Sequence, residues 1–413
     1  MRRTVGNCAS VDGLRLQSDN QDTRPFNALA VSVPSFAGVK QESARRIVTI
    51  ALEQLRRYAV ARSLFRPTTL VRAIDKLGYV QADPIRAPAR AQDLTLRHRV
   101  TDYRAGDLER RYPRLRLEED FLVNYGFLPR AHSELMHPRT ARHAWTRRRQ
   151  SQADAVLAFV RERGAVHPRE VDARFAHGKV TNWFGGSSNA TTRLLDEMHY
   201  RGLLRVTRRE GGTRVYAARE GSSESPDDDA TIAQRLDALV DIVVNKYAPL
   251  PASSLGRLLS LLCVGVPQWR TRRAATLIRA KQRLAYAKAG NEEWYWPETE
   301  SPTSRRWCPD AAVRLLTPFD PIVFDRRRFE IFWGWPYRFE AYVPPPKRKL
   351  GYYALPLLTH DRVVGWGNVA VKNGRLSCSF GYVSGRAPGG ADFRKGLAAE
   401  LDRMRLFLGL TCP

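Results

Sequence analysis

Residues 204–216 read LRVTRREGGTRVY, and this short run is the clearest guide to the fold of the 413-residue chain. Apolar and basic side chains alternate on both sides of a Gly-Gly pair, which is typical of two antiparallel strands joined by a tight turn. Patterns of three helices precede it, over residues 153–163, 168–175 and 189–201, and a glycine follows the first and the third. Three helices followed by a basic hairpin predict a winged helix.

The same order of elements returns after an acidic linker at residues 222–229. Two apolar helical patterns, a basic helical pattern and a hairpin follow one another, so we expect a second winged helix. Helical patterns between residues 48 and 100 predict a divergent first one. The segments of the second repeat are residues 231–247, 253–262, 269–281 and 284–296.

The C-terminal part is rich in strand-forming residues from about Leu316 onward. Short β-branched and aromatic runs with Gly and Pro between them predict a small antiparallel β-barrel, and a helix over residues 396–408 closes the chain. We therefore expect an α+β fold, with tandem winged-helix domains followed by a C-terminal antiparallel β-barrel. The strand runs are residues 338–343, 352–358, 363–367 and 376–380.

These patterns divide the chain into five parts. Residues 1–45 lack apolar periodicity, and we expect them to be a disordered arm or an extension before the true translation start. A helical or winged-helix domain follows at 46–149. The other boundaries are 150–221 and 230–300 for two winged helices and 310–413 for the barrel with its terminal helix.

The charge of the chain indicates a polyanionic partner. Its 68 Lys and Arg against 42 Asp and Glu give a formal net charge of +26, which attracts nucleic acid. A membrane surface is the rival partner, but no run of about 18 uninterrupted apolar residues is present to span a bilayer, and we expect no signal peptide near the start. We expect a monomer that binds double-stranded DNA.

The cysteines and histidines give no sign of metal or cofactor chemistry. The five cysteines are scattered, with no CxxC pair and no Cys/His cluster at zinc spacing. We read the closest histidines, His132 and His137, as ordinary surface residues. We therefore expect a reduced cytoplasmic, nucleoid-associated protein without disulfides, metal or cofactor.

Residues 79–85, YVQADPI, set an amide and a carboxylate two positions apart. The residue before a proline is disfavoured in helices, so the approach to Pro84 should be extended, and Gln81 and Asp83 should face the same side. An amide that orients a water, beside a carboxylate that activates the water or stabilises a cation, forms a hydrolytic pair. The alternative is structural, because Asp83 before Pro84 is also typical of a helix start.

Three runs stand out beside one another: LGYVQADPI at 77–85 with Ala89-Arg90 after it, LTPFDPIVFDR at 316–326, and YVPPPKRKLGYYALP at 342–356. They resemble motifs of the winged-helix DNA glycosylase family, AlkZ/YcaQ. The resemblance implies tandem winged helices and a β-barrel around DNA. It also implies excision of N7-alkylated purines and unhooking of interstrand crosslinks made through N7. The family's catalytic signature is glutamine, an apolar residue, then glutamine or aspartate, and residues 81–83 match the aspartate form.

The chemistry also follows from the leaving group. Alkylation at N7 makes guanine cationic, so the sugar can pass towards an oxocarbenium ion without an acid to protonate the base. Asp83 would stabilise that charge or take a proton from the attacking water, and Gln81 would position the water. A crosslinked base cannot rotate fully into a pocket, because its partner strand comes with it, so an open basic groove suits the substrate.

The remaining candidate site residues are aromatic or basic. Tyr125 or Phe127 can stack on a lesion or fill the core. They belong to the run NYGFLPR at 124–130, where close relatives are expected to carry an aromatic-histidine element. Clustered arginines are expected to contact phosphates and release counterions. They are Arg86, Arg90, Arg139, Arg142, Arg147, Arg148, Arg149, Arg205, Arg208 and Arg214.

Two other functions stay open at this point. A transcription regulator would read sequence with the winged helices and sense a ligand with the barrel, and a non-catalytic DNA-binding scaffold would keep only the fold. Gln81 and Asp83 favour the enzyme, because a regulator has no use for that pair. Formation of abasic sites in alkylated duplex would separate these functions.

Overall fold

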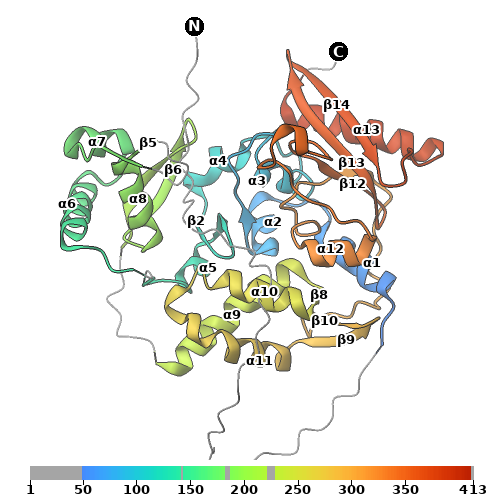
Figure 1. The fold of residues 1–413 in the computed structure, drawn as a ribbon, viewed down its shortest axis with the longest axis horizontal. Coiled ribbons are helices and arrows are strands. Elements are labelled where there is room, and N and C mark those ends of the chain that lie inside the picture. Colours follow the sequence, from blue (N-terminus) through green and yellow to red (C-terminus); the bar gives the residue numbers. More distant parts are fainter. Residues whose placement is uncertain (1–48, 141–142, 182–186, 221–227, 411–413) are drawn as a thin grey trace, which may run out of the picture.

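The chain is described by a computed structural model over residues 49–140, 143–181, 187–220 and 228–410. The arm at 1–45 and Arg142 lie outside the described residues. The fold is mixed α+β, and Figure 1 shows the helices and strands gathered into four groups, with the N-terminal group in the centre. The other three groups lie around it.

The central group holds the Gln81–Asp83 motif. Its helix α2 begins at Thr69, whose side chain accepts from the Arg72 N–H, and ends at Gly78, which takes the left-handed conformation at a φ of 67°. Its three strands form an antiparallel sheet in the order β1-β3-β2. The elements are α1 (Leu52–Ser63), α2 (Leu70–Leu77), β1 (Val80–Gln81), α3 (Ala91–Leu96), α4 (Asp107–Arg111), the 3₁₀ turn η1 (Tyr112–Arg114), β2 (Leu117–Phe121), β3 (Tyr125–Pro129) and α5 (Arg130–Glu134).

The second group contains the three helices and the hairpin expected between residues 150 and 220, and their order is confirmed. Asn189 caps the third helix by accepting from the Thr192 N–H. A short strand pair before this helix was not expected. The elements are α6 (Arg147–Arg163), α7 (Pro168–Phe175), β4 (Lys179–Thr181), β5 (Ser187–Asn189), α8 (Ala190–Tyr200), β6 (Leu204–Glu210) and β7 (Thr213–Ala218).

The third group repeats this order, as expected for residues 230–300. The basic segment is not one helix, because a 3₁₀ turn precedes it and Trp269 leaves helical geometry there. A two-residue strand joins the hairpin to give the sheet order β8-β10-β9. The elements are α9 (Asp229–Tyr247), β8 (Leu250–Pro251), α10 (Ala252–Leu262), η2 (Pro267–Arg272), α11 (Arg273–Arg283), β9 (Ala285–Ala289) and β10 (Glu292–Trp296).

The C-terminal group carries an open sheet, so the expected closed barrel is wrong. Its four antiparallel strands have the order β11-β12-β13-β14, and the two end strands do not pair with each other in the described chain. The expected terminal helix is present as α13 and ends at Gly409. The elements are β11 (Arg314–Leu315), α12 (Arg326–Trp333), η3 (Pro345–Lys347), β12 (Leu355–Thr359), β13 (Arg362–Lys372), β14 (Arg375–Tyr382) and α13 (Ala391–Leu408).

Residues 338–343, expected as a strand, form none in the structure, and a turn lies at 341–342. The Val343 N–H donates to the Glu340 carbonyl at 3.0 Å, which closes the chain on itself. The Glu340 carboxylate accepts the backbone N–H groups of residues 349–351 at 2.8–3.2 Å. These local bonds compete with strand pairing, and the three prolines that follow lack N–H donors.

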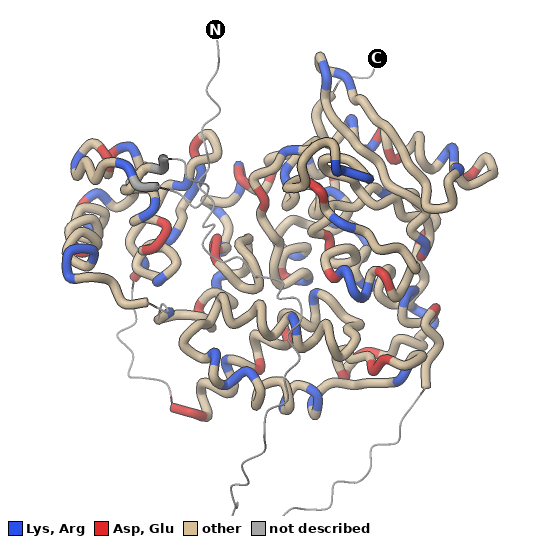
Figure 2. Tube along the Cα trace, viewed as in Figure 1, with Lys and Arg blue, Asp and Glu red and all other residues tan. Residues whose placement is uncertain are grey.

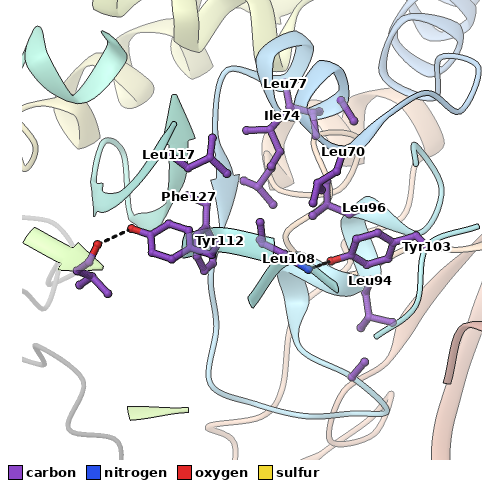
Figure 3. Packing of buried hydrophobic residues seen from close by; sticks show 14 of the residues in the cluster. Leu70, Ile74, Leu77, Leu94, Leu96, Tyr103, Leu108, Tyr112, Leu117 and Phe127 are labelled. Atoms are coloured by element: carbon purple, nitrogen blue, oxygen red, sulfur yellow. Dashed lines mark hydrogen bonds between the residues drawn. The ribbon is translucent and has the colours of Figure 1, made fainter. Parts of the chain in front are cut away.

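The largest cluster of buried apolar side chains joins the central group to the second group and to the C-terminal sheet. Figure 3 shows its central portion, where the side chains of α2 pack with those around α3 and β2. The Tyr112 hydroxyl donates to the Val206 carbonyl at 2.9 Å and ties this core to the hairpin β6–β7. Val80 is fully buried in the cluster, and Ala82 and Ile85 pack against it. The core therefore fixes the backbone on which Gln81 and Asp83 stand.

In the described part of the chain, no helix is both long enough and apolar enough to cross a bilayer.

Candidate active site and DNA-contacting residues

The backbone of the motif is extended up to Gln81, as expected. β1 pairs with β3 through Val80 and Gln81, and the Ala82 N–H donates to the Tyr125 carbonyl at 3.0 Å. No helix begins at Pro84, because the next one, α3, starts at Ala91. The interpretation of Asp83 as a helix cap is therefore wrong.

Gly126 allows β3 to approach the motif closely. It lies opposite Gln81 in the strand pair. A Cβ atom at this position would lie 2.4 Å from the Tyr79 ring and 2.4 Å from the Val80 carbonyl oxygen. A larger residue would therefore push β3 away from β1, and with it the support of Gln81.

The side chain of Gln81 is buried, with 4% of its surface exposed. Its amide oxygen Oε1 has no hydrogen-bond partner among the described residues. Leaving a buried acceptor unsatisfied costs about 1–3 kcal/mol, so such atoms often mark sites that bind a water or a substrate group. A water molecule that donates to Oε1 would satisfy it.

Asp83 is partly buried and is held by a local turn. Its Oδ1 atom accepts from the Ile85 N–H at 2.8 Å, and its own N–H donates to Gln92 Oε1 at 3.4 Å. Burial raises the pKa of Asp83, and the Ile85 N–H offsets part of that rise. None of the described Lys, Arg or His side chains forms an ion pair with this carboxylate. Its negative charge is therefore available to a cationic substrate.

Tyr353 of the C-terminal group, which the sequence did not single out, lies near enough to Asp83 to feel its charge. The Tyr353 hydroxyl lies 3.2 Å from Thr317 Oγ1, and both side chains are buried. Burial raises the pKa of Tyr353, and the charge of Asp83 raises it further. The three sequence runs at 77–85, 316–326 and 342–356 therefore meet in one place. The sequence did not show that these runs lie together, because they are far apart along the chain.

The run at 316–326 also fastens the C-terminal group to the central one. Arg99 and Asp320 form a fully buried bidentate pair, with N–O distances of 2.8 and 3.0 Å. Arg99 also donates to the Ser63 and Thr95 carbonyls at 2.8 Å. Asp320 is thus satisfied by Arg99 and has a structural role.

Lys246 of α9 supports the motif from behind. Its side chain is buried and its Nζ donates to the Tyr79 carbonyl. Burial, together with the nearby charge of Arg99, lowers its pKa to about 7. It lines a cavity of about 370 Å³ with Gly78 and His132. Neither Gln81 nor Asp83 lines this cavity, so the candidate pair does not open into it.

Three consecutive acidic residues of β2, Glu118, Glu119 and Asp120, bind arginines, and we call them the β2 clamp. All three are buried. The hairpin arginines among their partners bind Glu118 and Glu119. Arg209 pairs with Glu119 at 2.5 Å, and Arg205 pairs with Glu118 at 2.8 Å. The other partners of the clamp are Arg130, His137, Arg139, Arg214 and Arg219.

The clamp engages three of the arginines expected on DNA. Arg139 is buried, pairs with Asp120 at 3.1 Å, and donates to the Gly265 and Tyr200 carbonyls. Arg205 is mostly covered at its pair with Glu118. Arg214 pairs with Asp196 at 2.7 Å and lies over the Tyr125 ring. Arg205 and Arg214 hold the hairpin against the central group, whereas Arg139 joins β2 to the end of α8 and to the third group.

Two more of the expected arginines lie in ion pairs: Arg90 with Glu109, and Arg149 with Glu197. The side chain of Arg208 is 44% exposed and pairs with Glu210. Arg86, Arg147 and Arg148 are also exposed.

The aromatic candidates occupy the core and the clamp. Phe127 is fully buried and packs edge-on against Tyr112, with ring centroids 5.6 Å apart. The Tyr125 hydroxyl donates to Glu119 at 2.7 Å. The structure thus places both side chains in packing and hydrogen bonding within the central group.

Replacing Glu119 with Gln is expected to lower the free energy of unfolding by about 2 kcal/mol, because charged hydrogen bonds are lost while Arg209 stays buried. The matched control is Glu210→Gln, since Glu210 forms an exposed pair with Arg208. This control should cost less than about 1 kcal/mol. Urea unfolding measures the free energy of unfolding of both variants. Equally small losses in the two would show that the clamp does not stabilise the fold.

The clamp also makes stability depend on pH. Burial alone would raise the pKa of Glu119, but Arg209, Arg214 and Tyr125 outweigh it and hold the pKa below its ordinary value of 4.5. A depressed pKa in the folded state means that the contribution to stability is complete above that ordinary value and is lost as the pH falls through the folded value. The stability difference between wild type and Glu119→Gln should therefore shrink in acid.

The chain is basic. In its described part, the Asp83 carboxylate forms no ion pair and lies two residues from Gln81, whose buried amide oxygen is unsatisfied. These are features of a hydrolase that acts on nucleic acid. The sequence model of the family described as DNA glycosylase AlkZ-like matches residues 74–407. The chain belongs to the AlkZ-like DNA glycosylase family, and it is a DNA glycosylase, an enzyme of DNA repair. The resemblance inferred from the three sequence runs is confirmed.

A solved structure shares the fold. The chain is similar to the Streptomyces sahachiroi DNA glycosylase AlkZ, with a TM-score of 0.56 and 13% sequence identity. The match covers 88% of this chain and 98% of that one. At this identity the likeness concerns the fold alone.

Proposed function

We propose that this DNA glycosylase hydrolyses the N-glycosidic bond of cationic N7-alkylated purines, with Asp83 and Gln81 as its catalytic residues. One observation carries the proposal. Asp83 is a partly buried carboxylate that no described cation pairs with, two residues from the unsatisfied amide oxygen of Gln81. Duplex DNA is the substrate, since DNA binding is inherent in the family.

The reaction needs no second carboxylate. As the C1′–N9 bond breaks, its electron pair moves to the purine and neutralises the positive charge that N7-alkylation created. The sugar becomes an oxocarbenium ion, which the Asp83 carboxylate stabilises. A water molecule that donates to Gln81 Oε1 attacks C1′, and its proton passes to Asp83. The products are a neutral alkylated purine and an abasic site.

Interstrand crosslinks made through N7 extend the substrate range. Each crosslinked purine carries the same positive charge, so breaking one glycosidic bond would unhook the strands. Asp83 lies beside the exposed residues Pro84 and Arg86, which suits a base that cannot rotate fully away from its partner strand.

We also propose that residues 150–221 and 230–300 are winged helices that position the duplex. The element order of both groups supports this, and the domain limits stay as the sequence predicts. Figure 2 shows Lys and Arg distributed over all groups, with Asp and Glu between them. Since clamp contacts occupy several hairpin arginines, the exposed Arg147 and Arg148 at the start of α6 are the stronger candidates for phosphate contacts.

Incubation with alkylated duplex tests the proposed reaction. Purified protein should release N7-methylguanine and leave abasic sites, which strand cleavage by hot alkali reveals. Unmodified duplex of the same sequence is the control. Absence of abasic sites together with tight binding to one DNA sequence would instead support a regulator, and binding without either property would support a scaffold.

Neutralising Arg147 and Arg148 together as glutamines should flatten the dependence of duplex affinity on salt. Each lost phosphate contact lowers the log–log slope by roughly 0.9, so a decrease of roughly 1–2 is expected. Arg327→Gln is the control, because Arg327 is exposed but paired with Glu292. Fluorescence anisotropy at several salt concentrations measures the slopes. An unchanged slope in the double variant would show that Arg147 and Arg148 do not contact the phosphates.

A further inference from the structure

The loop of residues 339–353, between α12 and β12, carries exposed aromatic side chains, and we call it the tyrosine loop. Tyr342 is 79% exposed and Tyr352 is 45% exposed. Among the large apolar side chains exposed in the described chain, these two are the aromatic ones. Single exposed apolar residues are common, but two exposed rings on one loop require an explanation.

Hydrogen bonds hold the tyrosine loop in one conformation. The Glu340 carboxylate accepts three consecutive backbone N–H groups, those of Lys349, Leu350 and Gly351. The Leu350 carbonyl in turn accepts from Trp366 Nε1 at 3.0 Å and from the Asn368 amide at 2.8 Å, both on β13. The exposed rings are therefore presented on a fixed support.

The same loop is basic. Lys347 and Lys349 are exposed. Arg348 lies over the Tyr352 ring at 5.0 Å and donates to the Val343 carbonyl at 2.8 Å, which orients both side chains. Aromatic rings beside lysines and an arginine combine base stacking with attraction to phosphates.

The tyrosine loop lies next to the candidate active site. Phe339 contacts Tyr342 and Tyr353, with ring centroids 6.0 and 5.1 Å apart. Asp83, Tyr342 and Tyr352 all contribute to raising the pKa of Tyr353. Phe339 and Tyr353 belong to the same apolar cluster as Ala82. The loop therefore borders the motif.

We propose that the tyrosine loop binds an unpaired nucleotide of the DNA substrate next to the excised base, with Tyr342 stacked on its base and Lys347 and Lys349 at its phosphates. An intact duplex hides the faces of its bases, so an exposed ring can stack only where pairing is disrupted. This contact rests on the proposed function, because it assigns the loop to the same reaction. It keeps the strand open at a lesion that cannot be withdrawn into a pocket.

Tyr342→Ala should lose this contact, whereas Tyr342→Phe should keep it, since stacking needs the ring and not the hydroxyl. The probe is a duplex that carries 2-aminopurine in an unpaired position opposite an abasic site. Stacking quenches its fluorescence. Wild type and Tyr342→Phe should quench it and bind it about tenfold more tightly than Tyr342→Ala does. Affinity for fully paired duplex should stay the same in all three proteins.

Leu406→Ala is the control for loss of an exposed apolar side chain, since Leu406 lies on α13 and is also exposed. It should behave as wild type, and thermal melting should show that every variant is folded. Equal quenching and affinity in wild type and Tyr342→Ala would overturn the proposal, as would a loss in Tyr342→Phe equal to that in Tyr342→Ala. The measurement uses no excision, so failure to release N7-methylguanine would affect the proposed function and leave this result to stand by itself.

Discussion

Asp83→Asn is expected to reduce single-turnover release of N7-methylguanine by about 10²-fold or more, with duplex binding retained. Asparagine has the same shape, and its amide oxygen can still accept the Ile85 N–H that holds Asp83 in its turn. The negative charge is lost, and with it both the stabilisation of the oxocarbenium ion and the site that accepts the proton of the water. Gln81→Ala should show a smaller loss, because water positioning contributes less than the charge.

The pH profile separates this chemistry from a structural role. Burial raises the pKa of Asp83 above its ordinary value of 3.8. The ionised form is the active one, so the wild-type rate should rise with pH through that raised pKa and then level off. Asp83→Asn should lack the rise. Since no helix begins at Pro84, lost capping is not available to explain a slow variant, and a variant that melts normally yet turns over at the wild-type rate would exclude Asp83 from catalysis.

Neutral bases should be excised slower than N7-methylguanine by roughly 10²–10⁴-fold, which is the range that a general acid contributes. A neutral purine leaves with negative charge unless an acid protonates it, whereas the methylated base leaves neutral. Asp83 is the carboxylate proposed for the site, and its role requires the ionised form. Uracil, hypoxanthine and N7-methylguanine placed in otherwise identical duplexes, under single-turnover conditions, give the three rates.

Similar rates on neutral and cationic bases would show that the enzyme supplies a proton. Tyr353 does not meet that need in the described structure, because burial and the Asp83 charge raise its pKa and its hydroxyl already lies beside Thr317. A substrate that is unreactive in duplex but reactive in a single strand would instead indicate that strand opening, and not bond cleavage, limits the rate.

The elements that the sequence predicted well are those with local causes. Gly-Gly turns, helix-ending glycines and apolar periodicity act over a few residues, so α7 and the hairpins β6–β7 and β9–β10 lie where expected. The prediction of a closed barrel failed because closure requires pairing between strands that are far apart in the chain. The strand predicted at 338–343 is absent because the Glu340 side chain accepts hydrogen bonds from backbone N–H groups nine to eleven residues ahead.

The candidate site was predictable in part for the same reason. Gln81 and Asp83 are neighbours in sequence, and a proline sets their backbone, so the pair was visible. An arginine that contacts DNA and an arginine that pairs with a buried carboxylate look alike in sequence, so Arg139 and Arg214 were assigned to DNA. The acidic run at 118–120 was the available signal, since consecutive carboxylates that become buried need cationic partners. Tyr353 had no local signal.

The three-stranded sheet of the central group connects the hairpin β6–β7 to the candidate catalytic residue Gln81. The hairpin β6–β7 is bound to β2 by the clamp, β2 pairs with β3, and β3 pairs with β1 at Gln81. Two strand spacings separate β2 from β1, roughly 10 Å, and hydrogen bonds stiffen the whole width. In the proposed mechanism, a duplex that displaces the hairpin would therefore also displace Gln81, which would couple DNA binding mechanically to the position of the attacking water.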